Sequence, residues 1–201
     1  MGLQDPMRPA ETDALSTHQR HFIRLAQYNT WFNGQIYDHV ERLDDEERHR
    51  DRGAFFGSIH ATLDHLILCD RSWLGRIRKS GLPFPSLTDA ELVDSIASLD
   101  EGVFPRFESL RAGRRATDRV LECFVAELTP ELLATDLEYR NSKGIPFSQP
   151  LWHVVAHVFN HQTHHRGQVT TLLSQLGIDP GITDFLVTGM MPFPGEEPTS
   201  R

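Results

Sequence analysis

The stretch Leu151–Val169, LWHVVAHVFNHQTHHRGQV, contains five of the eleven histidines in this chain of 201 residues. Four of the five recur at intervals of four residues, at positions 153, 157, 161 and 165. Residues four apart lie one turn above another on an α-helix, so this spacing predicts a row of imidazoles along one helix. Pro150 before the stretch and Gly177 after it are typical of a helix start and a helix end.

Three more segments show apolar residues spaced three and four apart, which predicts three further amphipathic helices. These segments are 16–43, 58–79 and 103–128. Ser16 followed by Gln19 predicts a capping box at the first helix, and Ser58 predicts an N-cap at the second. Short alternating runs on both sides of the sequence NSKG, at 141–144, predict a small β-hairpin between the third and fourth helices.

Four long helices without an alternating strand and helix pattern predict an all-α fold, a four-helix bundle that carries this hairpin. We expect the bundle to occupy residues 15–190. The segments 1–14 and 191–201 are expected to be disordered tails, because they are polar and rich in proline.

The charge balance argues against two classes of partner. The formal net charge is −8 and the isoelectric point is about 5.7, which opposes binding to nucleic acid or to an anionic membrane surface. No apolar stretch approaches a bilayer span, and the N-terminus lacks a secretory signal, so a cytoplasmic location is expected. Cys69 and Cys123 both lie in apolar helical patterns, which favours small core residues in a reducing compartment.

Helical phase separates the histidines of the opening stretch. His161 and His165 fall on the same side of the helix as Val158 and Leu172, so they interrupt its apolar stripe, whereas the other three lie on the flank. Two imidazoles on an apolar stripe need partners, because a buried polar group without a partner costs about 1–3 kcal/mol. The pair could bind a metal ion with a third ligand, or form hydrogen bonds to each other, to water or to a carboxylate.

The helix expected at 58–79 can supply the third ligand. His65 lies on a stripe of small and apolar residues that can face the bundle interior, and Cys69 follows one turn later. Cys69 is therefore either a fourth ligand or, as is more common for such a cysteine, a small buried residue. His60 is expected to be exposed or at an interface, and Asp64 and Asp70 to lie at the surface or behind the ligands.

Two segments, TLDHLILCDRSWLGRI (Thr62–Ile77) and HVFNHQTHHRGQVTTLLSQLG (His157–Gly177), resemble the DinB-like family, also called the DinB/YfiT-like family. The resemblance implies a four-helix bundle, commonly a homodimer, that binds a divalent metal through three histidines. Matched motif to motif, the implied ligands are His65, His161 and His165. Three imidazoles suit zinc, nickel or iron, and copper as well, so the sequence does not select the metal.

The resemblance also bears on function. Characterised relatives include a maleylpyruvate isomerase that uses mycothiol and a transferase that attaches bacillithiol to electrophiles, and the family name refers to induction by DNA damage. We therefore expect a metal-dependent low-molecular-weight thiol S-transferase or hydrolase, whose partners are a small-molecule electrophile and a low-molecular-weight thiol. The alternative is a non-catalytic, metal-binding stress or interaction protein. Residues expected to contact substrate or to support the ligands are Asn160, His164, Arg166 and Gln168.

Overall fold

The computed structural model describes residues 15–88, 102–141 and 143–191. The expected tail at 1–14 lies outside the described residues, as does all of the expected tail at 191–201 except Met191.

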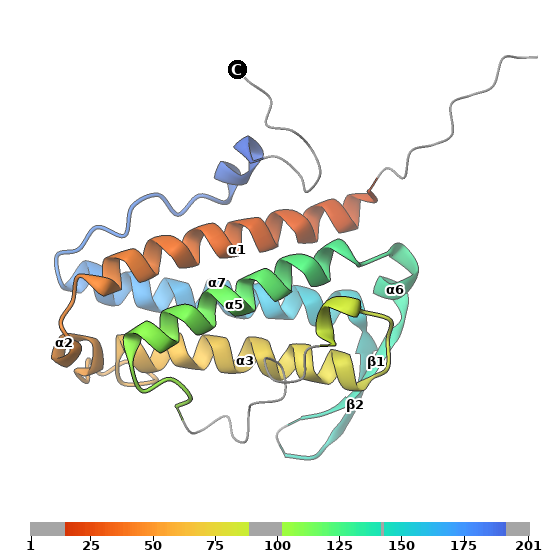
Figure 1. The fold of residues 1–201 in the computed structure, drawn as a ribbon, viewed down its shortest axis with the longest axis horizontal. Coiled ribbons are helices and arrows are strands. Elements are labelled where there is room, and N and C mark those ends of the chain that lie inside the picture. Colours follow the sequence, from red (N-terminus) through yellow and green to blue (C-terminus); the bar gives the residue numbers. More distant parts are fainter. Residues whose placement is uncertain (1–14, 89–101, 142, 192–201) are drawn as a thin grey trace, which may run out of the picture.

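Four long helices form the bundle, as predicted (Figure 1). They are α1 (Thr17–Glu41), α3 (Ile59–Lys79), α5 (Phe107–Ala126) and α7 (Leu151–Gln175). Helix α1 packs against α5 and α7, and α3 packs against the same two helices, so α1 and α3 are diagonal neighbours. Figure 1 shows α3 and α5 running in one direction and α1 and α7 in the other. The contacting pair α3 and α7 is therefore antiparallel.

Smaller elements connect the long helices. They are α2 (Asp45–His49), η1 (Pro85–Leu87), α6 (Pro130–Ala134), β1 (Asp136–Arg140), β2 (Pro146–Pro150) and η2 (Phe185–Met190). The two strands pair antiparallel, with Tyr139 opposite Phe147, which confirms the predicted hairpin. Asn141 shapes its turn, because its side-chain oxygen accepts from the backbone N–H groups of Lys143 and Ile145. The segment after α7 contains η2, which packs against α1.

The helix ends follow the sequence signals. The hydroxyl of Ser16 accepts from the backbone N–H of Gln19, and Ser58 caps α3 in the same way. Only this half of the predicted capping box is present among the described residues, and the side-chain N–H of Gln19 donates to the carbonyl oxygen of Ala126. At the end of α7, Gly177 has a positive φ of 75°, a conformation that favours glycine and lets the N–H of the next residue reach Leu173.

The bundle core consists of two apolar clusters. One contains Phe22, Leu74, Phe124 and Phe159, and the other contains Tyr37, Leu63, Leu110 and Leu173. Each cluster takes residues from all four long helices. Buried polar side chains lie between the two clusters, and they form the layer described below.

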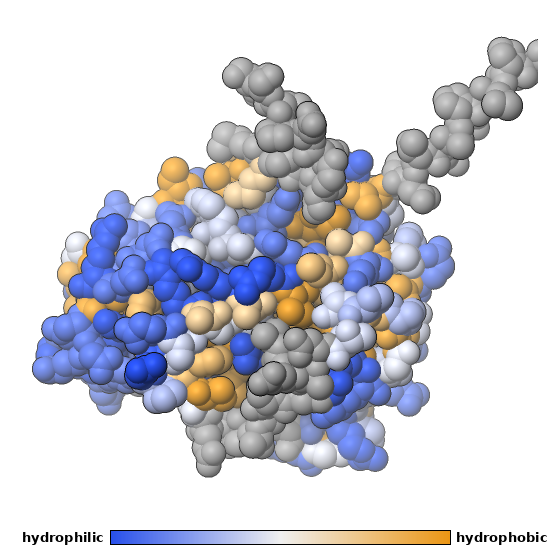
Figure 2. Space-filling model, viewed as in Figure 1, coloured by the Kyte–Doolittle hydropathy of each residue, from blue (hydrophilic) through white to orange (hydrophobic). Residues whose placement is uncertain are grey.

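On the face viewed in Figure 2, hydrophilic residues predominate on the left, around α2, and hydrophobic patches lie among hydrophilic residues elsewhere. The prediction that Cys123 is a core residue was wrong, because it lies on the exposed side of α5. Leu121 and Phe124 are close to Cys123 in sequence and are buried, but helical spacing turns the Cys123 side chain away from them. Within the described ranges, no helix is both long and apolar enough to cross a bilayer.

Candidate metal centre

The antiparallel packing of α3 and α7 brings three histidine side chains together. The Nε2 atom of His161 lies 3.3 Å from Nε2 of His65 and 3.0 Å from Nε2 of His165. His65 and His161 are 96 residues apart in sequence, so only the packing of the two helices can produce this contact. The structure thus brings all three predicted ligands to one place.

Cys69 lies at the same place. Its sulfur is 3.4 Å from Nε2 of His65, one turn earlier on α3. Donor atoms of His65, Cys69 and His161 lie within 4.8 Å of one another, which is close enough to hold one metal ion. His165 joins this group through His161. Both interpretations of Cys69, as a ligand and as a small half-buried residue, therefore agree with its position.

The spacing of the donor atoms fits a metal ion. Nitrogen ligands about 2.0–2.1 Å from a tetrahedral ion stand about 3.4 Å from one another, and a sulfur ligand at about 2.3 Å stands about 3.6 Å from each nitrogen. The observed nitrogen separations of 3.3 and 3.0 Å and the sulfur to nitrogen separation of 3.4 Å are close to these values. Three imidazoles and one thiol are also donors that zinc, nickel and iron accept.

Hydrogen bonds alone do not satisfy this arrangement well. Each imidazole nitrogen carries either one proton or one lone pair, which points outward in the ring plane. The Nε2 atom of His161 faces two other Nε2 atoms, so it cannot direct one proton or one lone pair at both of them. A cation between the rings would use all three lone pairs.

The surroundings favour neutral imidazoles with a defined orientation. Burial lowers the pKa of His65 to about 4 and that of His161 to about 3, and the neighbouring His165 contributes to both. Burial also lowers the pKa of His165. The Oε1 atom of Gln168 lies 2.7 Å from Nδ1 of His165. When Nδ1 carries the proton and donates to Gln168, Nε2 is left with a free lone pair.

An aromatic ring covers one side of the centre. Phe56, in the connection between α2 and α3, stacks on His65 with ring centroids 3.9 Å apart, and it also contacts His165. This contact restricts the orientation of the His65 ring and covers one of its two faces.

The remaining histidines of α7 lie outside this group. His153, His157 and His164 are exposed, as their helical phase predicts. His157 lies farther along the same row, with its ring against Trp73. On α3, the prediction that His60 is exposed or at an interface was wrong. It is buried, because its Nε2 atom lies 2.7 Å from the carbonyl oxygen of Phe104 and His49 stacks on its ring.

The residues expected to support the ligands or to contact substrate have different positions. Gln168 is half-buried and contacts His165, as a supporting residue would. Asn160 and His164 are exposed, and the Nε2 atom of His164 lies 3.3 Å from the Gln168 amide. Arg166 is buried in the core, where it donates to Asn29 and lies over the rings of Tyr28 and Phe32.

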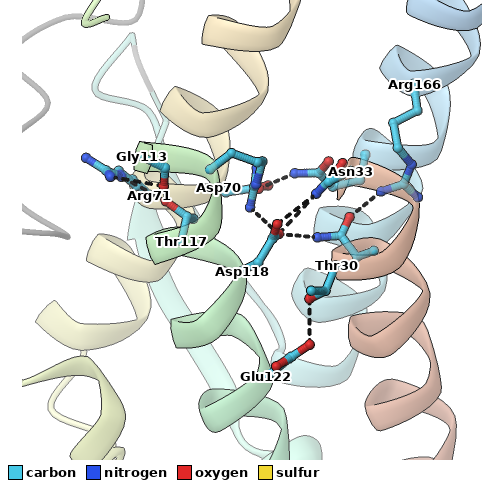
Figure 3. Close-up of polar contacts among 12 residues, drawn as sticks. Thr30, Asn33, Asp70, Arg71, Gly113, Thr117, Asp118, Glu122 and Arg166 are labelled. Carbon is cyan, nitrogen blue, oxygen red and sulfur yellow. Dashed lines mark hydrogen bonds and ion pairs between the residues drawn. The ribbon is translucent and has the colours of Figure 1, made fainter. Parts of the chain in front are cut away.

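A layer of buried polar side chains crosses the core of the bundle (Figure 3), and it includes Asp70 and Gln162, the sequence neighbours of Cys69 and His161. Arg114 of α5 forms ion pairs with Asp70 and Asp118, at 2.6 and 2.8 Å. Gln162 of α7 donates to Asp70, and Asn29 and Asn33 of α1 donate to Asp118. The layer therefore connects all four long helices through side chains.

This layer was not predicted. Asp64 and Asp70 were expected at the surface or behind the ligands, yet both are buried. Asp70 lies in the core, where its partners are Arg114 and Gln162. Asp64 accepts from the backbone N–H of Val103. Polar residues at 29, 33, 70, 114, 118, 162 and 166 all fall on the apolar faces of their helices, and this shared phase was the available signal.

Comparisons with known proteins give a family match and a similar curated protein. The sequence profile described as the DinB family matches residues 15–196. The chain is also similar to a curated protein called Protein DinB from Bacillus subtilis (strain 168). The two are 28% identical over 165 residues, which cover 81% of this chain and 90% of that protein.

Proposed function

This chain belongs to the DinB family, and on that premise we propose that it is a metal-dependent enzyme that transfers a low-molecular-weight thiol to a small electrophile, or hydrolyses such a molecule. The proposed metal ligands are His65, His161 and His165, and the proposed metal is zinc, nickel or iron. The observation that carries the proposal is the position of the His161 Nε2 atom, which lies about one ligand spacing from the Nε2 atoms of both His65 and His165.

A metal held by three neutral histidines has room for a further ligand, as catalytic sites do. When bound, such an ion lowers the pKa of a coordinated thiol or water and polarises a carbonyl group. The residues of the chain hold the donors in place. Gln168 fixes the tautomer of His165, and Phe56 covers one face of the His65 ring.

The first experiment is elemental analysis of the purified protein by mass spectrometry. We expect about one zinc, nickel or iron ion per chain. A panel of low-molecular-weight thiols is then tested with an electrophile such as 1-chloro-2,4-dinitrobenzene, using metal-loaded and chelator-treated protein. Turnover that needs the metal supports the proposal. A protein that holds no metal after reconstitution with zinc, nickel and iron would refute it.

A second function is favoured by the position of Cys69. If its sulfur takes the fourth position, the site is closed, as in structural metal sites, and the ion serves mainly to stabilise the bundle. This non-catalytic stress or interaction protein would unfold at a lower temperature after metal removal and would show no turnover with any thiol of the panel. Both measurements use the same samples as the first experiment.

We also propose that the protein is a homodimer, as the family resemblance implies. Sedimentation velocity of the metal-loaded protein tests this directly. A single species at the mass of one chain, 22.9 kDa, would contradict it.

A further inference from the structure

The face of α3 that carries His65 and Cys69 continues toward the hairpin with Trp73 and Arg76. Intervals of four, four and three residues keep these four side chains on one side of the helix. On the facing helix, His157 continues the row of His161 and His165. The two rows meet beyond the candidate metal centre, where the rings of Trp73 and His157 are 5.2 Å apart.

Aromatic rings from the hairpin extend this meeting point. Tyr139 of β1 packs edge-on against Trp73 at 5.1 Å, and Phe147 of β2 stacks on Tyr139 at 5.6 Å. We call the surface formed by Trp73, His157 and Tyr139 the aromatic ledge. A hollow of about 640 Å³ runs along the hairpin and adjoins the ledge at Tyr139; its lining residues are Glu138, Tyr139, Arg140, Pro146, Phe147 and Ser148.

Arg76 places a positive charge beside the aromatic ledge. Its guanidinium carbon lies 4.5 Å from the centre of the Trp73 ring and 5.9 Å from that of Tyr139. The side chain is half-buried, and among the described residues no carboxylate forms an ion pair with it. Arg114 and Arg111 contrast with it, because each is paired with two carboxylates.

A half-buried guanidinium that pairs with no carboxylate of the described residues is an unusual feature next to a candidate metal centre. The N–H donors of a guanidinium form a planar fork that can bind both oxygens of one carboxylate. The aromatic rings beside Arg76 offer a flat surface on which the carbon chain of a ligand can pack. Arg76 follows Cys69 by seven residues, which is about 10 Å along a helix, and the long arginine side chain can shorten this distance. A ligand that joins the guanidinium to the candidate metal centre must therefore, together with the arginine side chain, span a rise of about 10 Å.

We propose that Arg76, on the aromatic ledge, binds the carboxylate of a small molecule whose other end reaches the metal held by His65, His161 and His165. This inference rests on the proposed function and adds the chemical class of the ligand. The carboxylate can belong to the thiol or to its electrophilic acceptor, and the experiment below separates these two sources.

The test compares matched probes by calorimetry on protein loaded with cobalt(II). The thiol arm uses 3-mercaptopropanoate and its neutral analogue 3-mercaptopropan-1-ol. The acceptor arm uses maleate and its neutral analogue maleamide. We expect the charged member of at least one pair to bind about tenfold or more tightly, because the guanidinium and the carboxylate form a charge-assisted pair. The arm that shows the preference identifies the source of the carboxylate.

Arg76→Met should reduce this preference to twofold or less while leaving the neutral probe unchanged. Arg76→Lys, which keeps the charge and loses the forked geometry, should retain part of it. Lys79→Met is the matched control, because it removes one charge from an exposed position on the same helix and should keep the full preference. No preference in the wild type in either arm, or an unchanged preference in Arg76→Met, would overturn the proposal.

A metal-free arm separates this proposal from the proposed function. Butanoate is titrated into metal-free protein, and the NMR signal of the Trp73 indole N–H is followed, with Trp73→Phe identifying that signal. A shift that Arg76→Met abolishes supports carboxylate binding at Arg76 even if cobalt does not bind. If cobalt binds in stoichiometric amount and neither butanoate nor the charged probes respond to Arg76, the carboxylate site is wrong and the metal site stands.

Discussion

The side-chain amide of Gln162 donates to the carboxylate of Asp70 in the centre of the bundle, and each residue directly adjoins a member of the candidate metal centre in sequence. Asp70 follows Cys69, and Gln162 follows His161. Neighbouring residues on a helix point about 100° apart, so this buried bond fixes the rotation at which α3 and α7 present their outer side chains to each other. The polar layer thus aligns the two helices.

Loss of Asp70 should destabilise the protein strongly. Asp70→Ala leaves the buried Arg114 with one carboxylate in place of two and removes the acceptor of Gln162, so we expect the free energy of unfolding to fall by about 3–5 kcal/mol. Asp38→Ala is the control, since it removes an exposed partner of Arg111 and should cost less than about 1 kcal/mol. Urea denaturation followed by circular dichroism measures both variants. If Asp70→Ala lowered the free energy of unfolding no more than Asp38→Ala, the polar layer would contribute little to stability.

The three proposed ligands should each be necessary for metal binding. His65→Ala, His161→Ala and His165→Ala should reduce the metal content from about one ion per chain to a small fraction. His153→Ala removes an exposed histidine of the same helix and should keep the wild-type content. Elemental analysis after reconstitution and gel filtration measures this. Wild-type metal content in His65→Ala or His165→Ala would refute the assignment.

Beside His65 and His161, the third donor to the metal is either Cys69 or His165, and two variants distinguish these possibilities. If the three histidines are the ligands, Cys69→Ser keeps stoichiometric metal and His165→Ala loses it. If the closer group of His65, Cys69 and His161 is the binding unit, the opposite result follows. Cobalt(II) substitution adds a spectroscopic measurement, because a bound thiolate gives a sulfur-to-cobalt absorption band in the near ultraviolet. We expect any such band in the wild-type protein to disappear in Cys69→Ser.

The stability of the metal-free protein should decrease in mildly acidic solution. Burial lowers the pKa of His65 to about 4 and that of His161 to about 3 in the folded state, whereas imidazoles of an unfolded chain titrate near about 6.5. As the pH falls below about 6.5, the unfolded chain takes up protons that the folded chain does not, so the free energy of unfolding decreases toward pH 4. Metal should be released over the same range, because protonated imidazoles do not bind it.

Thermal melts of chelator-treated protein between pH 7.5 and 4.5 test this prediction. His161→Gln should lose less stability over that range than the wild type, because it removes one of the groups with a lowered pKa. His153→Gln, which alters an exposed histidine, should follow the wild-type curve. If the melting temperature of His161→Gln fell with pH as much as that of the wild type, the prediction would be contradicted.

Much of the fold could be predicted from local sequence signals. Caps at Ser16 and Ser58, the glycine at 177 and the turn at 141–144 act through neighbouring residues, so they could be recognised in the sequence. The meeting of His65 with His161 was also accessible, because family resemblance and helical phase pointed to the same residues. The metal itself stays a prediction.

Other features depend on contacts between helices that no local pattern contains. Because charged residues are mostly exposed, Asp70 was expected at the surface or behind the ligands, although its helical phase is that of the apolar face of α3. Its burial depends on Arg114 and Gln162, which lie 44 and 92 residues away in sequence. The burial of His60 likewise depends on the carbonyl of Phe104, 44 residues away. The ledge around Arg76 needed the position of the hairpin against α3, which sequence periodicity does not define.

The division of the core into two apolar clusters has a consequence for how the protein folds. Each cluster contains one half of every long helix, so neither can assemble from a continuous piece of chain. Detaching any one helix removes residues from both clusters and breaks the polar layer between them. The bundle should therefore have no stable half-folded form, and the slowest-exchanging amide protons of all four helices should report the same opening free energy in native-state hydrogen exchange.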